Sequence, residues 1–139
     1  MSNMYSIAKL AILREFLSAA QTLALTELAM GVERAFYLDK IDEMVNVVQT
    51  MPVTYQQDNL GDEAVVHLHY FRGGADWFIT EKDIDGGIDQ AFGFAELGFG
   101  HGELGYISIR ELAAAGAELD LHWTVKTLRE AKEALYHVA

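Results

Sequence analysis

The sequence contains no cysteine, and this absence excludes several kinds of chemistry at once. Disulfide bridges, thiol nucleophiles and thiolate zinc sites all require cysteine, so this chain can use none of them. A chain without disulfides suits a reducing compartment, and we expect a cytoplasmic protein. With 139 residues, of which 51% are hydrophobic, the chain can bury a core without cross-links.

Long uninterrupted apolar runs are also missing. A helix that spans a bilayer needs about 20 consecutive apolar residues. Charged residues interrupt the apolar N-terminal region at Lys9, Arg14, Glu15 and Glu27. Lys9 lies inside the apolar pattern rather than before it, which is not typical of a secretory signal. We therefore expect no membrane partner.

Basic residues are scarce, with 10 Lys and Arg against 21 Asp and Glu, and the net charge is -11. Such a chain repels phosphate, which disfavours direct binding of nucleic acid. The acidic excess has two interpretations: it keeps the protein soluble, or it forms a face that binds a basic partner surface. Lys82 is the only lysine or arginine among residues 76–103. The carboxylates in that stretch are the candidate partner-binding residues, namely Asp76, Glu81, Asp83, Asp85, Asp89, Glu96 and Glu103.

Apolar residues at helical spacing predict a helix over residues 5 to about 20. A second helical piece over residues 23–30 continues the first or follows a bend. The apolar stripe of this region needs a cover, which is either the rest of the protein or a partner helix across a homodimer. A third helix is expected to begin at Asp39 and to end at or before Met51, because Pro52 follows.

Two capping boxes mark helix starts in the second half of the chain. Residues 108–111 read Ser-x-x-Glu, which predicts a short helix that Gly116 closes. Residues 127–130 read Thr-x-x-Glu, which predicts a C-terminal helix to about Val138.

Between these helical segments the pattern is typical of strands. Two apolar runs, 65–71 and 77–80, flank a Gly-Gly turn and predict a β-hairpin. Further strands are expected at 90–96, 104–107 and 118–123. The predicted fold class is α+β: a small, largely antiparallel sheet on which N-terminal, short internal and C-terminal helices pack. We expect one domain over 1–139, with a helical part at 1–57 and a sheet-containing core with the C-terminal helix at 62–139.

Two histidines are the main hint of a metal site. His67 and His69 are two residues apart on a predicted strand, so their side chains leave the same face. Glu81 or Asp83 could supply a third ligand for zinc, copper or iron. Two imidazoles on the wetter face of a half-buried strand is the simpler interpretation, and we expect no metal and no cofactor.

Four short segments carry a family resemblance through their order along the chain. They are residues 69–71 (HYF), 76–81 (DWFITE), 91–98 (AFGFAELG) and 103–108 (ELGYIS). Together they resemble the DUF2958 family, small bacterial proteins of unassigned function, over roughly residues 64–123. Gly102 stands where family members often have proline. The resemblance implies a setting on plasmids, integrative elements and phages, and it implies no catalytic residue.

These observations favour a non-enzymatic, acidic protein-binding module of a mobile genetic element. In its sharpest form it is an anti-CRISPR or anti-restriction inhibitor. It would act as a DNA mimic and occupy a basic nucleic-acid-binding surface of a host defence protein. One alternative is a homo-oligomeric scaffold. Another is a small metal-dependent enzyme that uses His67, His69 and Glu81.

Overall fold

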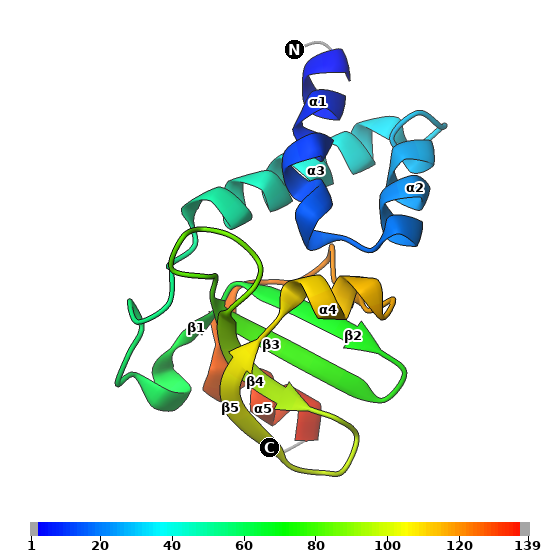
Figure 1. Cartoon of the computed structure of the whole chain (residues 1–139). Coiled ribbons are helices and arrows are strands. Elements are labelled where there is room, and N and C mark those ends of the chain that lie inside the picture. The colour runs from blue at the N-terminus through cyan, green and yellow to red at the C-terminus, as the bar shows by residue number, and fades with distance from the viewer. Residues whose placement is uncertain (1–2, 137–139) are drawn as a thin grey trace.

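A five-stranded antiparallel sheet forms the centre of the computed structural model, which describes residues 3–136 (Figure 1). All its neighbouring strands run antiparallel, which confirms the predicted α+β class. In spatial order the strands are β5 (Gly102–Ile107), β4 (Ala91–Glu96), β3 (Ala75–Glu81), β2 (Leu68–Arg72) and β6 (Glu118–Leu119).

The predicted hairpin is present. β2 and β3 pair in continuous register, and Gly73 in the turn between them adopts φ +57°, a left-handed conformation that glycine reaches at little cost. β4 follows as predicted and packs its backbone tightly against β3 at Gly93. A side chain at Gly93 would collide with the carbonyl group of Phe78.

Two strand predictions are wrong in detail. The run 65–71 is interrupted at His67, because β1 (Val65–Val66) pairs with β7 (Lys126–Thr127) in a separate two-stranded sheet. The strand expected over 118–123 ends at Leu119. Asp120 then forms a turn, in which its carboxylate accepts from the His122 N–H at 2.9 Å.

The N-terminal helices depart from the predicted boundaries. The helix expected over 5–20 ends early: α1 (Asn3–Leu13) leads into a short 3-10 helix, η1 (Arg14–Phe16). Ser18 then caps α2 (Ala19–Leu28), and its hydroxyl accepts from the Gln21 N–H at 3.0 Å. α3 (Arg34–Thr50) begins five residues before Asp39, so Asp39 lies inside the helix rather than at its start. It ends before Pro52, as predicted.

Both predicted helix starts are capped. The Ser108 hydroxyl accepts from the Glu111 N–H at 3.1 Å at the start of α4 (Ile109–Ala114). The Thr127 N–H donates to the Glu130 carboxylate at 2.9 Å at the start of α5 (Leu128–Tyr136). Val138, the expected end of that helix, lies outside the described residues.

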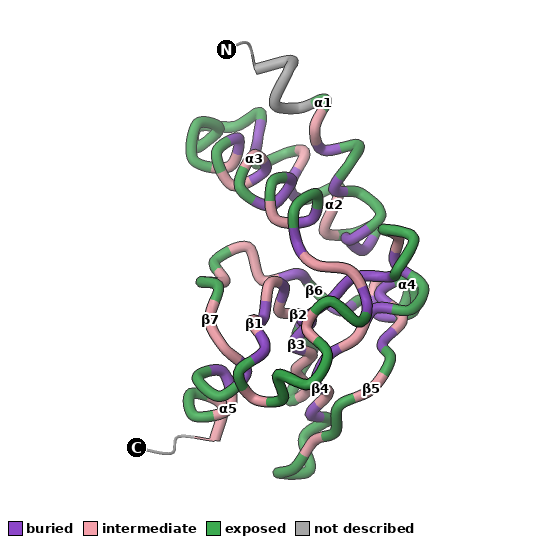
Figure 2. The backbone as a smooth tube through the Cα atoms, turned by 90° about the vertical axis from the view of Figure 1, so that its left-hand side faces the viewer, coloured by how far each residue is buried: buried purple, intermediate pink, exposed green. Residues whose placement is uncertain are grey.

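The two faces of the sheet are buried against different helices (Figures 1 and 2). One face joins the N-terminal helices and α4 in a continuous core that includes Leu13, Phe16, Ile41, Leu68, Tyr70, Ile79, Ile107 and Ile109. Polar contacts tie the same layers together, because the buried Tyr70 hydroxyl donates to the Phe16 carbonyl at 2.6 Å. The opposite face packs Phe78 and Phe94 against Leu128 and Ala131 of α5.

Part of the apolar stripe predicted over residues 5–20 is covered within the chain. Leu10, Leu13 and Phe16 are buried in the core that α3 shares. Apolar side chains do remain exposed on α2 and in the turn after it, at Leu23, Leu28, Met30 and Val32. A homodimer through the N-terminal region stays a prediction. No helix within residues 3–136 has both the length and the apolar character needed to cross a bilayer.

Gly93 and its cross-strand partner Gly105 provide a matched test of the sheet. Gly93→Ala should lower the free energy of unfolding by roughly 1–3 kcal/mol, because the new methyl group meets the backbone of β3. Gly105→Ala should change it by less than about 0.5 kcal/mol, because no atom lies within 4 Å of the added carbon. Urea unfolding measures both variants. If both variants lose the same free energy of unfolding, the close approach of the β3 backbone to Gly93 does not determine the stability of the sheet.

Candidate functional site

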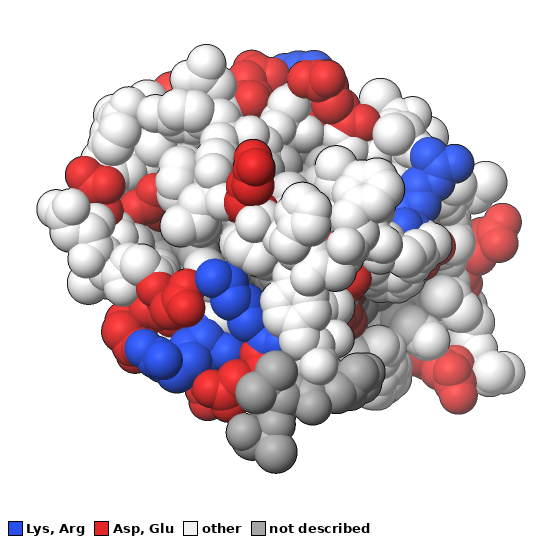
Figure 3. Space-filling model, turned by 90° about the horizontal axis from the view of Figure 1, so that it is seen from below, with Lys and Arg blue, Asp and Glu red and all other residues white. Residues whose placement is uncertain are grey.

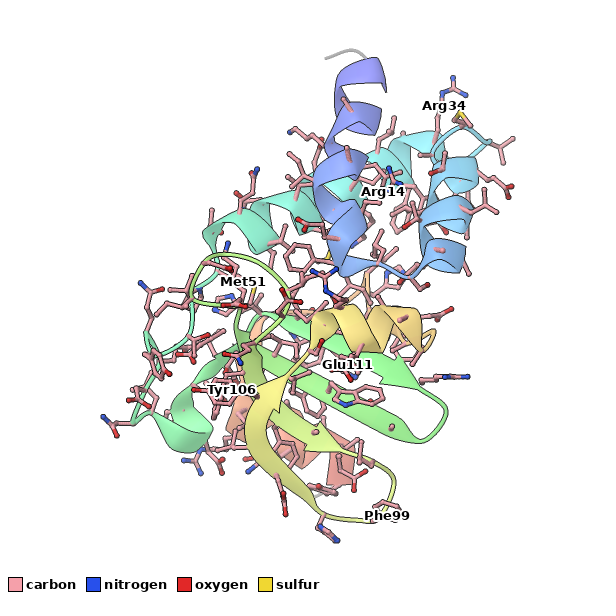
Figure 4. The ribbon with its side chains drawn as sticks, in the orientation of Figure 1. Arg14, Arg34, Met51, Phe99, Tyr106 and Glu111 are labelled. Carbon is pink, nitrogen blue, oxygen red and sulfur yellow. The ribbon has the colours of Figure 1, made fainter. Side chains whose placement is uncertain are left out.

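A pocket of about 270 Å³ lies between the segment that follows α3 and the strands β3, β4 and β5. Its lining combines two carboxylates with three aromatic rings, and no lysine or arginine takes part. The residues that give it this character are Asp58, Glu81, Tyr55, Phe92 and Tyr106. Tyr106 lies on β5, on the side toward the segment that carries η2 (Gly61–Glu63) (Figure 4).

Glu81, at the end of β3, holds one wall of the pocket in place. Its side chain is buried, and its carboxylate accepts from the backbone N–H groups of Tyr55, at 3.2 Å, and of Gln57. The Gln57 side chain in turn donates to the Thr80 carbonyl at 2.7 Å and accepts from the Val65 N–H at 2.7 Å. Two sets of contacts therefore anchor this wall to the strands. The Glu81 side chain binds the backbone of the wall, and the Gln57 side chain of the wall binds the backbone of Thr80 and Val65.

The backbone of Tyr55 is strained at this point. Its φ is +81°, in the left-handed region, which is uncommon for a bulky residue. Such a conformation costs on the order of 1–3 kcal/mol and persists only where the surroundings impose it. The hydrogen bond from the Tyr55 N–H to Glu81 is such a constraint. The strained backbone places the Tyr55 hydroxyl 2.9 Å from the hydroxyl of Tyr106.

The electrostatics of the pocket favour a cation. The hydrogen bond with Tyr55 is the largest cause that raises the pKa of Tyr106, and the charges of Asp58 and Glu81 act in the same direction. The phenol therefore stays neutral at physiological pH beside two carboxylates. The Tyr106 ring also meets Phe92 edge-on, with the centroids 5.7 Å apart. Carboxylates beside aromatic rings suit the side chain of lysine or arginine.

Three of the seven predicted partner-binding carboxylates are buried. Besides Glu81, they are Asp83, which accepts from the Gln90 N–H at 2.9 Å, and Glu96, which accepts from the Gly98 N–H at 2.6 Å. The expectation that they form an exposed face is wrong for these three. Backbone N–H groups at turns need acceptors, and these carboxylates supply them.

The other four predicted carboxylates do not form one unpaired surface. Asp76 is half-buried and lies 2.7 Å from His69, and Asp89 forms an ion pair with Arg110 at 2.7 Å. The Arg110 guanidinium lowers the pKa of Asp89. Of these four, only Asp85 and Glu103 are exposed and have no ion pair within the described part of the chain. On the face seen in Figure 3, some acidic side chains lie beside lysine and arginine side chains and others stand alone on an uncharged surface.

The proposed metal ligands His67, His69 and Glu81 do not come together. Among residues 3–136 no group of three or more potential ligands is arranged to hold a metal ion. The His69 ring lies between two carboxylates, with Nε2 2.7 Å from Asp76 and Nδ1 3.0 Å from Asp120, and it stacks on Phe78. Both of its nitrogens already have partners, so it offers no free nitrogen to a metal or a substrate. Burial lowers the pKa of His67, which lies in the break between β1 and β2.

Sequence reasoning missed Tyr55, Asp58 and Tyr106 as site residues. Two of them lie in the segment between α3 and the sheet, which the sequence marks only as polar. The segment at 103–108 includes Tyr106, but the resemblance gives it no role. Its hydroxyl contact with Tyr55 spans 51 residues of sequence. No local pattern indicates such a pairing.

Glu81→Gln tests the structural role of the buried carboxylate. The amide keeps one acceptor but directs N–H groups at a backbone donor, so the free energy of unfolding should fall by about 1–3 kcal/mol. Hydrogen exchange should quicken at the amides of Tyr55 and Gln57. Glu103→Gln, which removes an exposed charge from β5, should leave both quantities unchanged. Unchanged exchange at Tyr55 and Gln57 in Glu81→Gln would contradict the anchoring role.

Comparison with known proteins extends the family resemblance. Searches of curated proteins and of solved structures found no match. A family model described as a protein of unknown function, DUF2958, matches residues 39–135. The match is wider than the segment 64–123, and it includes most of α3, the whole sheet, the pocket and most of α5. Because this match covers well over half of the sequence, the chain belongs to the DUF2958 family.

Proposed function

We propose that this protein acts by binding a basic partner protein rather than by catalysis, and that a lysine or arginine side chain of the partner enters the pocket. The observation that carries this proposal is the pocket lining. Asp58 and Glu81 supply negative charge, aromatic rings supply faces, and no lysine or arginine is among the described residues that line the pocket.

The protein already uses aromatic rings to hold cations on the same face of the sheet. The Lys132 ammonium lies 4.5 Å from the Phe94 ring, and the Lys126 ammonium lies 4.7 Å from the Trp123 ring. Side chains alternate along a strand, so Phe92 lies on the same face as Phe94. At the Phe92 end the lining contains no lysine or arginine, so a partner would supply the cation. Such a contact is worth about 0.5–1 kcal/mol when exposed and about 2 kcal/mol when desolvated.

The resemblance implies a setting on mobile genetic elements, and this setting suggests the identity of the partner. The partner would be a nucleic-acid-binding defence protein, and the protein would be an anti-CRISPR or anti-restriction inhibitor. The burial of Glu81, Asp83 and Glu96 argues against a broad DNA-mimic face built from the seven carboxylates. In the proposed mode, the protein would hold one basic segment of the partner at the pocket. It would thereby compete with nucleic acid for that segment alone rather than cover a broad surface.

Titration with capped tetralysine and tetraarginine peptides tests the proposal. At low ionic strength the largest amide shifts of the ¹⁵N-labelled protein should fall at Tyr55, Asp58 and Tyr106. Asp58→Asn should weaken binding about three-fold, as expected for a partly exposed ion pair. Adding Tyr106→Ala to Asp58→Asn should bring the loss to about ten-fold, because the ring contact is lost as well.

Asp39→Asn is the matched control, because it removes the same charge from an exposed position on α3. It should leave the peptide affinity unchanged apart from the small effect of net charge. If Asp39→Asn and Asp58→Asn weaken binding equally, the peptides respond to overall charge and the pocket is not the site. Capped tetraglutamate should not bind.

A further inference from the structure

β5 is an open edge of the sheet. It pairs with β4 along all six residues, and no backbone hydrogen bond joins its outer side to another described segment. β5 lies at the margin of the molecule, with no other segment beyond it in this view (Figure 2). An edge of this kind presents a row of unpaired N–H and C=O groups.

The edge also has little of the usual protection against added strands, since Glu103 is its single charged residue. Proteins protect edges with lysine, proline, bulges or very short strands. β5 contains no lysine and no proline, and its register with β4 is unshifted from Gly102 to Ile107. The opposite edge differs, because β6 pairs with β2 over only two residues before the turn at Asp120. β5 therefore offers about 20 Å of continuous strand for pairing.

The pocket adjoins this edge. Leu104 and Tyr106 of β5 both line the pocket, and their spacing of two puts them on one face of the strand. A residue directly opposite either of them on an added strand would project to that same face, about 5 Å away between Cβ atoms. Its side chain could therefore reach into the pocket toward the carboxylates.

We infer that an extended segment of the basic partner pairs with β5 as a sixth strand and places a lysine or arginine in the pocket. This inference rests on the proposed function and adds the mode of recognition. Backbone pairing supplies affinity, and the pocket selects for basic residues at alternate positions. A second copy of β5 is a poor occupant, because the segment Gly102–Ile107 carries one glutamate and no cation.

Backbone methylation of a designed peptide provides the test. The probe is the capped heptapeptide Thr-Lys-Thr-Lys-Thr-Lys-Thr, compared with one version N-methylated at every lysine and one N-methylated at every inner threonine. In an extended strand, alternate N–H groups point to opposite edges. One methylated version should therefore bind at least about ten-fold more weakly than the parent and the other should bind like it, because only one edge faces β5. Amides of β5 should become protected from hydrogen exchange when the parent peptide binds.

The outcomes separate the two proposals. If both methylated versions bind equally, strand pairing is wrong. If Asp58→Asn still weakens all the peptides in that case, the cation-binding pocket stands without strand addition. If no peptide binds, or Asp58→Asn behaves like Asp39→Asn, the proposed function fails and the strand inference fails with it.

Discussion

The pocket depends on one interaction, the contact between the buried Glu81 carboxylate and the backbone of the segment after α3. A buried carboxylate is tolerated only when hydrogen bonds satisfy it, and here the N–H groups of Tyr55 and Gln57 do so. The backbone of Tyr55 adopts a strained positive φ in this arrangement. This conformation places the Tyr55 hydroxyl beside the Tyr106 hydroxyl. The same charge also contributes to the negative potential that a cation would meet. Glu81 is therefore a structural anchor and an electrostatic element at once.

The size of α5 explains why the β5 end of the sheet stays open. A nine-residue helix is about 13.5 Å long, with a diameter of about 10 Å. Five strands spaced about 4.8 Å apart make a sheet roughly 20 Å wide. One such helix cannot cover that face, and it packs over Phe78 and Phe94. The segment with Tyr55 and Asp58 fills part of the remaining area, and what it leaves open is the pocket beside Leu104 and Tyr106.

Sequence patterns predicted the elements of this fold better than its site. Alternation, the Gly-Gly turn, Pro52 and the two capping boxes are local signals, and the hairpin, β4, β5, α4 and the end of α3 follow them. The boundary at Asp39 is wrong because an acidic residue suits an exposed helix interior as well as a cap. The role of Glu81, Asp83 and Glu96 could not be predicted, because it depends on which backbone N–H groups the folded chain leaves without acceptors. The composition gives the number of carboxylates. It does not show which carboxylates will accept hydrogen bonds from the backbone N–H groups of turns.

Charge therefore acts at two ranges in this protein, and the ranges have different structural requirements. The net charge of -11 creates a field around the whole protein, because that field reflects the sum of all charges rather than the hydrogen bonds of any one carboxylate. Salt weakens this field over a distance of about 10 Å at 0.1 M ionic strength. That field speeds the encounter with any basic partner but cannot select among partners. Selection needs short-range geometry, and in the proposed mode of binding Asp58, Tyr106 and the adjoining edge of β5 would supply it. The burial of predicted acidic residues thus weakens the case for a charged docking face without weakening the case for steering. In the proposed mode of binding, recognition would depend instead on a few residues at one edge of the sheet.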